Sequence, residues 1–250
     1  MLVTVVGSGD AFGSGGRFQT CIALAGEGPA APVHTLVDCG ATSLVALRKA
    51  DVDLAAIETV LVSHLHGDHF GGLPFLILDG QFRRRTKDLT VVGPPGTNVR
   101  LAEVMEILFP GSSTVRRRFN VRVIEHADGD VLNLERMTVT AFEVRHASGA
   151  PAYALRVRDR EAGSSVAYSG DTEWTEALVR VADGADVFLC EGYAPQPVRW
   201  HLDLDSLARN ADRLACRRLV LTHMSPATLG LNRLDWEAAH DGMVINPSGG

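Results

Sequence analysis

Side chains that could bind a metal ion are concentrated in the segment Ser63-His64-Leu65-His66-Gly67-Asp68-His69, directly after the apolar run Thr59-Val60-Leu61-Val62. Neutral imidazoles and a carboxylate are the ligands that a borderline-soft divalent ion such as zinc selects. An ordinary solvated loop has no need for four such groups within six positions. The segment therefore predicts a metal site immediately behind a buried strand.

Further candidate ligands follow other apolar, strand-like runs. His146, Asp171 and His223 each come shortly after such a run. Open α/β sheets place ligand sites beyond the carboxyl ends of their strands, so these side chains can converge although 159 residues separate His64 from His223. A lone histidine at a strand end is usually incidental. The cluster changes that expectation, because one ion needs about four ligands and a pair needs more.

The elements that must position these groups form one domain over residues 1–250, with mixed β and α/β halves. The glycine-rich loop 7–17 matches no nucleotide-binding fingerprint. It either lets the backbone approach a ligand or simply connects two strands. The apolar periodicity predicts helices at 42–50, 70–78, 97–109, 173–182 and 203–215. It predicts strands at 2–6, 20–24, 34–40, 59–62, 89–94, 121–125, 137–145, 152–157, 165–168, 186–191, 219–223 and 241–245.

The composition is that of an ordinary globular protein, with 46% hydrophobic and 22% charged residues. A net charge of −6 argues against a protein held on nucleic acid by bulk electrostatics alone. Two basic runs, 83–85 with Lys87 and 116–118, predict solvated faces, with phosphate contact as the alternative. His34 begins a strand and is expected at the surface.

The four cysteines contain no CxxC pair, and three of them lie in apolar runs, which predicts reduced, buried thiols. Residues 1–7 have the pattern of a first strand rather than of a signal peptide. No apolar stretch approaches the length of a membrane span. We therefore expect a cytoplasmic protein with no membrane partner.

The full ligand series resembles that of the metallo-β-lactamase superfamily. It comprises His64-x-His66-x-Asp68-His69, His146, Asp171 in Ser-Gly-Asp-Thr, and His223 in Leu-Thr-His-Met-Ser. The opening Gly-Ser-Gly-Asp-Ala and the closing Asp241-Gly242-Met243 match as well, so the resemblance covers the whole chain. It implies an α/β (α+β) fold, a four-layer αββα sandwich of two mixed β-sheets flanked by helices. It also implies that Asp38, in Val-Asp-Cys-Gly, supports the histidine loop without binding metal.

The resemblance assigns the ligands to two divalent ions. His64, His66 and His146 would hold one ion. Asp68, His69 and His223 would hold the second, and Asp171 would bridge the two. The mixture of histidine and aspartate ligands favours zinc over magnesium, and leaves manganese or iron open for the second site.

Within the superfamily the chain is most similar to the ribonuclease Z branch. Aspartate at position 171, where classical β-lactamases carry cysteine, indicates phosphoester rather than lactam chemistry. Glu191 and His201 match a pair that assists departure of the leaving group in that branch. The chain departs from the branch in having Cys-Glu-Gly-Tyr in place of His-Glu-Ala-Thr and in lacking a Gly/Pro-rich exosite arm for transfer RNA. Compact phosphodiesterases without the arm are the better match.

The hypothesis that follows is a binuclear hydrolase, a phosphodiesterase for a small or cyclic nucleotide-type phosphodiester or an RNA end. The two ions would share the attacking hydroxide, Asp68 would orient it, and His201, held by Glu191, would protonate the leaving group. For His201 the alternative is an ordinary surface histidine. Rival functions are hydrolysis of a lactone, thioester or sulfate ester by the same metal pair, and metal binding without turnover. The resemblance also implies a homodimer.

Overall fold

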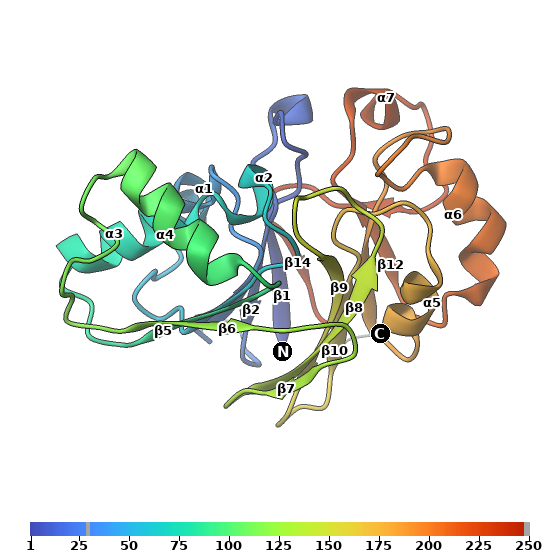
Figure 1. Ribbon diagram of the computed structural model, residues 1–250. Helices are drawn as coiled ribbons and strands as arrows, with labels where there is room; N and C mark the ends of the chain where they lie inside the picture. Colours follow the sequence, from blue (N-terminus) through green and yellow to red (C-terminus); the bar gives the residue numbers. More distant parts are fainter. Residues whose placement is uncertain (29–30, 248–250) are drawn as a thin grey trace.

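The computed structural model of the protein describes residues 1–28 and 31–247. Two β-sheets lie face to face, and helices cover the outer face of each sheet (Figure 1). Each sheet combines antiparallel and parallel strand pairs. The predicted four-layer αββα sandwich of two mixed sheets is therefore confirmed.

The chain fills the first sheet mainly with its N-terminal half and the second with its C-terminal half. The first sheet has the order β14 (Met243–Ile245), β1 (Leu2–Gly7), β2 (Cys21–Ala25), β3 (Val33–Val37), β4 (Thr59–Leu61), β5 (Leu89–Gly93), β6 (Val121–Glu125). The second has the order β13 (Glu237–Ala238), β12 (Leu219–Thr222), β11 (Val187–Glu191), β10 (Ser165–Tyr168), β9 (Ala152–Asp159), β8 (Met137–Val144), β7 (Val131–Asn133). The helices are α1 (Ser43–Lys49), α2 (Gly67–Phe70), α3 (Leu73–Phe82), α4 (Thr97–Leu108), α5 (Glu176–Ala182), α6 (Leu204–Asn210) and α7 (Pro226–Leu229).

Apolar side chains fill the space between the sheets and the space beneath each helical layer. In β8, buried Met137, Val139 and Ala141 alternate with half-buried threonines, so one face of the strand packs on the core. The parallel strand β4 is buried throughout, as expected for a strand covered on both faces. A rigid, covered sheet of this kind gives the loops at its strand ends a fixed base.

Several predicted helices end or begin differently in the structure. The helix predicted at 70–78 begins at Leu73, because Gly71 and Gly72 separate it from the short helix α2. The helix predicted at 203–215 ends at Asn210 and continues as a 3₁₀ turn, Ala211–Arg213.

Two expectations about surface residues are wrong. His34 is only 7% exposed, and its Nδ1 lies 2.9 Å from the hydroxyl oxygen of Thr35. Arg85 is also 7% exposed, because its guanidinium donates hydrogen bonds to the carbonyl oxygens of Leu54, Ile57, Lys87 and Asp88. This arginine links the segment before β4 to the segment before β5, whereas its neighbours Arg83 and Arg84 are exposed.

All four cysteines are free, and Cys21, Cys39 and Cys190 are buried, as predicted. None of the helices in the described ranges is both long and apolar enough to span a membrane.

Candidate metal centre

The candidate ligands lie together at one edge of the sandwich, where strands from both sheets end. The segment after β4 carries His64, His66, Asp68 and His69, the last two on α2. The second sheet supplies the remaining three ligands from the ends of three of its strands: His146 after β8, Asp171 after β10 and His223 after β12. The predicted convergence therefore occurs.

The seven side chains form two groups, and the ligand atoms within each group lie within 4.8 Å of one another. The first group is His64, His66 and His146, in which His66 Nδ1 lies 3.0 Å from His146 Nε2. The second group is Asp68, His69, Asp171 and His223. In it the two imidazole Nε2 atoms of His69 and His223 lie 3.3 Å apart. These groups match the two ligand sets that the sequence predicts.

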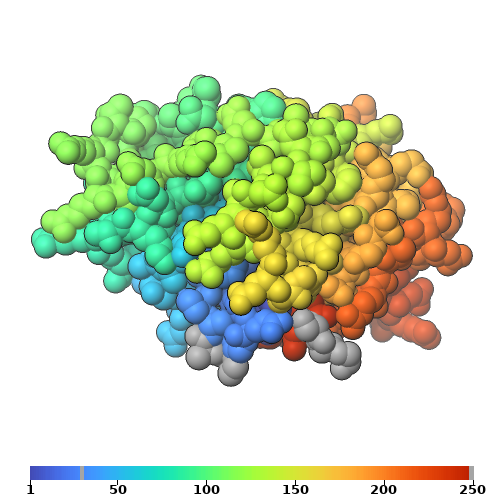
Figure 2. Space-filling view, turned by 90° about the horizontal axis from the view of Figure 1, so that it is seen from below, coloured from blue at the N-terminus to red at the C-terminus, as the bar shows by residue number. Residues whose placement is uncertain are grey.

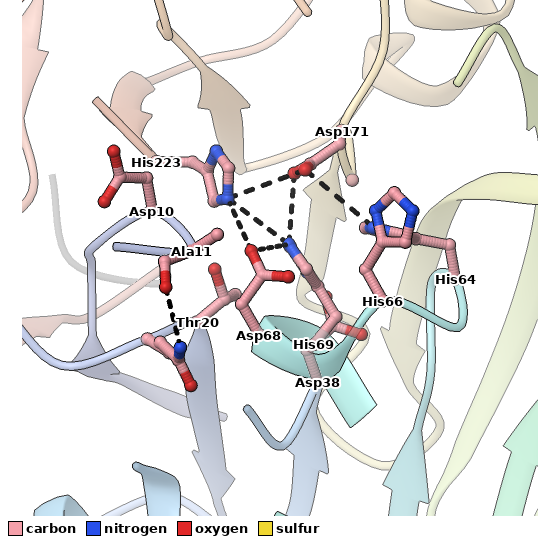
Figure 3. A network of polar contacts seen from close by, with 12 residues as sticks. Asp10, Ala11, Thr20, Asp38, His64, His66, Asp68, His69, Asp171 and His223 are labelled. Carbon is pink, nitrogen blue, oxygen red and sulfur yellow. Dashed lines mark hydrogen bonds and ion pairs between the residues drawn. The ribbon is translucent and has the colours of Figure 1, made fainter. Parts of the chain in front are cut away.

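Asp171 lies between the two groups. Its Oδ2 atom is 3.8 Å from His64 Nε2 and 3.5 Å from His223 Nε2. Its Oδ1 atom is 3.2 Å from His69 Nε2. Figure 3 shows this carboxylate between His223 on one side and His64 and His66 on the other, with dashed contacts to histidines of both groups. The position is the one that a bridging ligand requires.

Hydrogen bonds behind the cluster direct imidazole lone pairs into it. His69 Nδ1 donates to Asp38 Oδ2 at 2.7 Å, which leaves the Nε2 lone pair of a neutral His69 facing the other ligands. Ser63 Oγ donates to the same Asp38 oxygen at 2.8 Å, so it accepts from His64 Nδ1 at 3.1 Å. Asp38 thus supports the histidine loop without itself lying in either ligand group, as the resemblance implies.

A third bond of this type comes from the backbone. His146 Nδ1 donates to the carbonyl oxygen of Trp200 at 2.7 Å. Trp200 adopts a left-handed backbone conformation with φ 72°, which costs energy for a bulky side chain. Its amide also donates to Glu173 at 2.9 Å. The loop before His201 is therefore held in the conformation that orients His146.

The backbone at the strand ends turns sharply to present these groups. Asp38 and His223 follow β3 and β12, and both are left-handed, with φ 58° and 55°. Gly170, just before Asp171, is also left-handed, with φ 59°. Gly40 must lack a side chain, because a Cβ there would lie 2.2 Å from the carbonyl oxygen of Asp68. These turns bring the ligand helix α2 against the end of β3.

The electrostatics of the cluster call for cations. Four carboxylates, those of Asp38, Asp68, Asp171 and Glu191, are buried here, and among the described residues they form ion pairs only with histidines. Burial opposes a charge on His223, but Asp171, Asp68 and Glu191 outweigh it and raise the pKa of His223 to about 10. The same balance, with Asp171 foremost, raises the pKa of His69.

The first ligand group behaves differently. Burial, together with neighbouring imidazoles, lowers the pKa of His64 and of His66, so both are neutral at neutral pH. Neutral imidazole is the form that binds a metal. His64 Nε2 is buried and has no hydrogen-bond partner in the part of the chain that the structure describes. An orphaned acceptor, a surplus of buried carboxylate and a His/Asp donor set together fit a pair of divalent cations.

Glu191 and His201 lie beside the second ligand group. His201 Nδ1 donates to Glu191 Oε1 at 2.5 Å and lies 3.8 Å from Asp171 Oδ2. Glu191 Oε2 accepts from the amides of Thr172 and Leu202. Burial disfavours the charged imidazole, but the hydrogen bond and charge of Glu191 raise the pKa of His201. Since 22% of the His201 side chain is exposed, it can meet a substrate.

Sequence reasoning missed three residues that shape the site. Trp200 supplies its carbonyl to His146. The hydroxyl of Tyr168 lies 3.4 Å from His69 Nδ1, beneath the cluster. The ring of Tyr193 stacks on that of His201. The one signal available was that each aromatic residue stands within three positions of a candidate residue.

Residues 34–224 match the family described as "Beta-lactamase superfamily domain". The chain is 26% identical over 241 residues to ribonuclease Z of Methanosarcina mazei, covering 76% of this chain and 77% of the relative. It is 32% identical over 200 residues to an uncharacterised protein of Mycobacterium tuberculosis, covering 77% and 70%.

Solved structures agree with this assignment. The short form of human tRNase Z superposes with a TM-score of 0.77 at 26% identity, covering 98% of this chain and 99% of that one. A diphosphatase from the PhnP family superposes with a TM-score of 0.73 at 19% identity, covering 98% and 97%, and so shares the fold. The chain therefore belongs to the beta-lactamase superfamily, within its ribonuclease Z-like branch, and its His/Asp cluster binds divalent metal.

Proposed function

We propose that this metal-dependent hydrolase is a binuclear phosphodiesterase that cleaves a small or cyclic nucleotide-type phosphodiester or an RNA end. The observation that carries the proposal is Asp171. Its carboxylate lies 3.8 Å from His64 in one ligand group and 3.5 Å from His223 in the other. A carboxylate in this position suits two cations that act on one substrate. The ribonuclease Z relatives support phosphodiesters as the substrate class.

His64, His66 and His146 would hold one ion, Asp68, His69 and His223 the other, with Asp171 between them. We propose zinc for both, because imidazole and carboxylate ligands suit it, and manganese or iron is the alternative for the second ion. Bound here, a pair of divalent ions would neutralise phosphate oxygens and lower the pKa of water towards neutrality. The protein's own task is to fix the geometry around that chemistry.

Asp68 would orient the attacking water or accept its proton. Its Oδ2 atom lies 3.2 Å from the Nε2 atoms of both His69 and His223. These histidines outweigh the effect of burial and hold the pKa of Asp68 well below its usual range, so it is a carboxylate at neutral pH. An ionised carboxylate at the centre of the cluster can accept a hydrogen bond from water.

His201 would supply a proton to the departing alkoxide. Glu191 holds Nδ1 and stabilises the protonated ring, which leaves the Nε2 proton to face the substrate. General acid catalysis by a positioned side chain contributes about 10²- to 10⁴-fold. The need for it grows with the basicity of the leaving group.

The test compares methyl p-nitrophenyl phosphate with methyl phenyl phosphate, because phenolate is the more basic leaving group. We expect His201→Ala to slow the phenyl ester at least about tenfold more than the nitrophenyl ester. Equal slowing of both esters would remove His201 from the role of proton donor. His240→Ala, which removes an exposed histidine outside both ligand groups, is the matched control.

The substrate class needs a separate panel of bis-p-nitrophenyl phosphate, a 2′,3′-cyclic nucleotide and an acyl-homoserine lactone. Turnover of the lactone alone would favour the alternative, an ester hydrolase with the same metal pair. A homodimer also stays a prediction. We expect the segment Phe75–Leu78 of α3, in which Phe75 is exposed, to contribute to its contact.

A further inference from the structure

Tyr193 lies flat against the imidazole of His201. The two ring centroids are 4.2 Å apart, and the planes differ by 23°. Tyr193 comes two residues after Glu191, at the end of β11. One short segment therefore carries both the carboxylate that binds the edge of His201 and the ring that covers its face.

The backbone holds Tyr193 firmly in this place. Its amide donates to the carbonyl oxygen of Leu202 at 2.9 Å. Its own carbonyl accepts from the amide of Ser225 at 3.0 Å and from the hydroxyl of Thr228 at 2.7 Å. Three hydrogen bonds to two separate segments, one at Leu202 and one at the start of α7, thus fix the backbone of Tyr193. A two-torsion aromatic side chain on a fixed backbone has little freedom to move.

His201 needs this support, because a single hydrogen bond does not fix a ring. The bond from Nδ1 to Glu191 restrains one edge but lets the imidazole pivot about that bond. The ring of His146 meets that of His201 edge-on, with the ring centroids 5.0 Å apart and the planes at 67°. The His223 ring is nearly parallel to that of His201, at 14°, but its centroid is 5.9 Å away. Tyr193, at 4.2 Å, is the closer of the two stacked rings, so it sets the plane in which the other ring nitrogen, Nε2, points.

We propose that Tyr193 is a positioning residue that holds His201 in the plane required for proton delivery to the leaving group. The inference rests on the proposed phosphodiesterase function and names a residue beyond the Glu191–His201 pair. The aromatic face carries this role, since the Tyr193 hydroxyl makes no hydrogen bond with any of the described residues. Burial, then the nearby carboxylates of Asp10 and Glu191, raises the pKa of that hydroxyl, so it stays neutral.

The experiment separates the ring from the hydroxyl. Tyr193→Phe keeps the ring, and Tyr193→Leu removes the aromatic face while keeping an apolar side chain. With metal-loaded protein, we expect Tyr193→Phe to stay within about threefold of wild type on both aryl methyl phosphates. We expect Tyr193→Leu to lower kcat on methyl phenyl phosphate about 10- to 100-fold, and on the nitrophenyl ester far less.

A double-mutant cycle supplies the second readout. In the His201→Ala background, Tyr193→Leu should cause no further loss on the phenyl ester, because the group that it positions is already gone. Phe82→Leu, which removes an exposed aromatic ring on α3, is the matched control and should leave both rates unchanged. Additive losses, or equal slowing of the two esters, would overturn the proposal.

A crystal structure of Tyr193→Leu tests the geometry without turnover. We expect His201 to lose its single rotamer while Glu191 and the seven ligands keep theirs. An unmoved His201 would overturn the positioning role even if the enzyme hydrolyses phosphodiesters. Conversely, a wild-type enzyme inactive on every diester would refute the proposed function, and the His201 rotamer would still decide the role of Tyr193. If Tyr193→Leu does not fold, Tyr193→Met takes its place in the same measurements.

Discussion

His126 is a buried ionisable side chain that the proposed chemistry leaves unused. It follows β6 and packs edge-on against Tyr153, and neither ring nitrogen has a hydrogen-bond partner among residues 1–28 and 31–247. Burial lowers its pKa from 6.5 to about 4. Between these two values the unfolded chain binds a proton that the folded chain excludes. The His126 site therefore does not lower the free energy of unfolding above about pH 6.5, and lowers it increasingly as the pH drops towards 4.

We predict that His126→Leu reduces this loss. At pH 7 the variant should stay within about 1 kcal/mol of wild type, because no hydrogen bond is removed. Between pH 7 and pH 4.5 the free energy of unfolding of the variant should fall by about 2 kcal/mol less than that of wild type. Urea unfolding of both proteins at the two pH values is the measurement. An unchanged difference between pH 7 and pH 4.5 would show that His126 does not titrate in this way.

At the residue scale the sequence predicts the ligands but not how they are held. The types and spacing of His64 through His69 are specific because few other functions need four ligand groups so close together. No sequence pattern predicts the contacts that hold these ligands in place. Trp200 acts through a backbone carbonyl, which every residue possesses, and Tyr193 acts through a ring that equally well suits a core. Only the folded chain shows which aromatic residue meets which histidine.

At the scale of secondary-structure elements, the C-terminal end of α3 has an unusual backbone conformation. The helix closes with Arg84 in the left-handed region at φ 59°, and the Arg85 amide donates back to the carbonyl of Gly80. This is the arrangement in which glycine is usually found, because a Cβ is strained there. Arg84 itself is exposed, and its side chain makes no hydrogen bond or ion pair with the described residues.

We predict that Arg84→Gly stabilises the protein by about 0.5–1 kcal/mol, through relief of backbone strain. Arg83→Gly is the matched comparison, because Arg83 has φ −85° and its side chain contacts Asp79. That variant should be neutral or destabilised. Thermal unfolding of the two variants beside wild type gives the answer, and a lower melting temperature for Arg84→Gly would contradict the argument.

At the element scale most strands and helices follow from apolar periodicity, and the exceptions have physical causes. The pattern cannot reveal that Gly71 and Gly72 divide the ligand segment from α3, since apolar residues continue on both sides. It also cannot reveal the left-handed turns at Asp38 and His223. These conformations are imposed by packing at the ends of the strands and not by local preference.

Across the whole molecule, the ligands join the two sheets. Four come from the segment after β4 in the first sheet, and three come from strand ends of the second. Ions bound by both sheets bind the folded chain in preference to the unfolded one. Zinc at about a hundredfold excess over its dissociation constant would add about 3 kcal/mol of stability.

We therefore expect zinc to raise the melting temperature of chelator-treated protein by several degrees, and elemental analysis to give close to two ions per chain. Asp171→Asn should lower both quantities, because it removes the shared ligand. Asp212→Asn alters an exposed carboxylate away from the cluster and serves as the control. An Asp171→Asn protein that still binds two ions would refute the bridging role.

The first sheet contains a strand from the far end of the chain. The three residues of β14, Met243–Ile245, pair with β1 and form the short outer strand beside it. Figure 2 shows the face on which the N-terminal segments, in blue, lie close to the red C-terminal ones. Until residue 245 has been synthesised, one edge of β1 presents unpaired amides and carbonyls to other chains. Translation thus makes β1 long before the strand that covers its edge, so a nascent chain, or one clipped before β14, has a surface at which aggregation can begin.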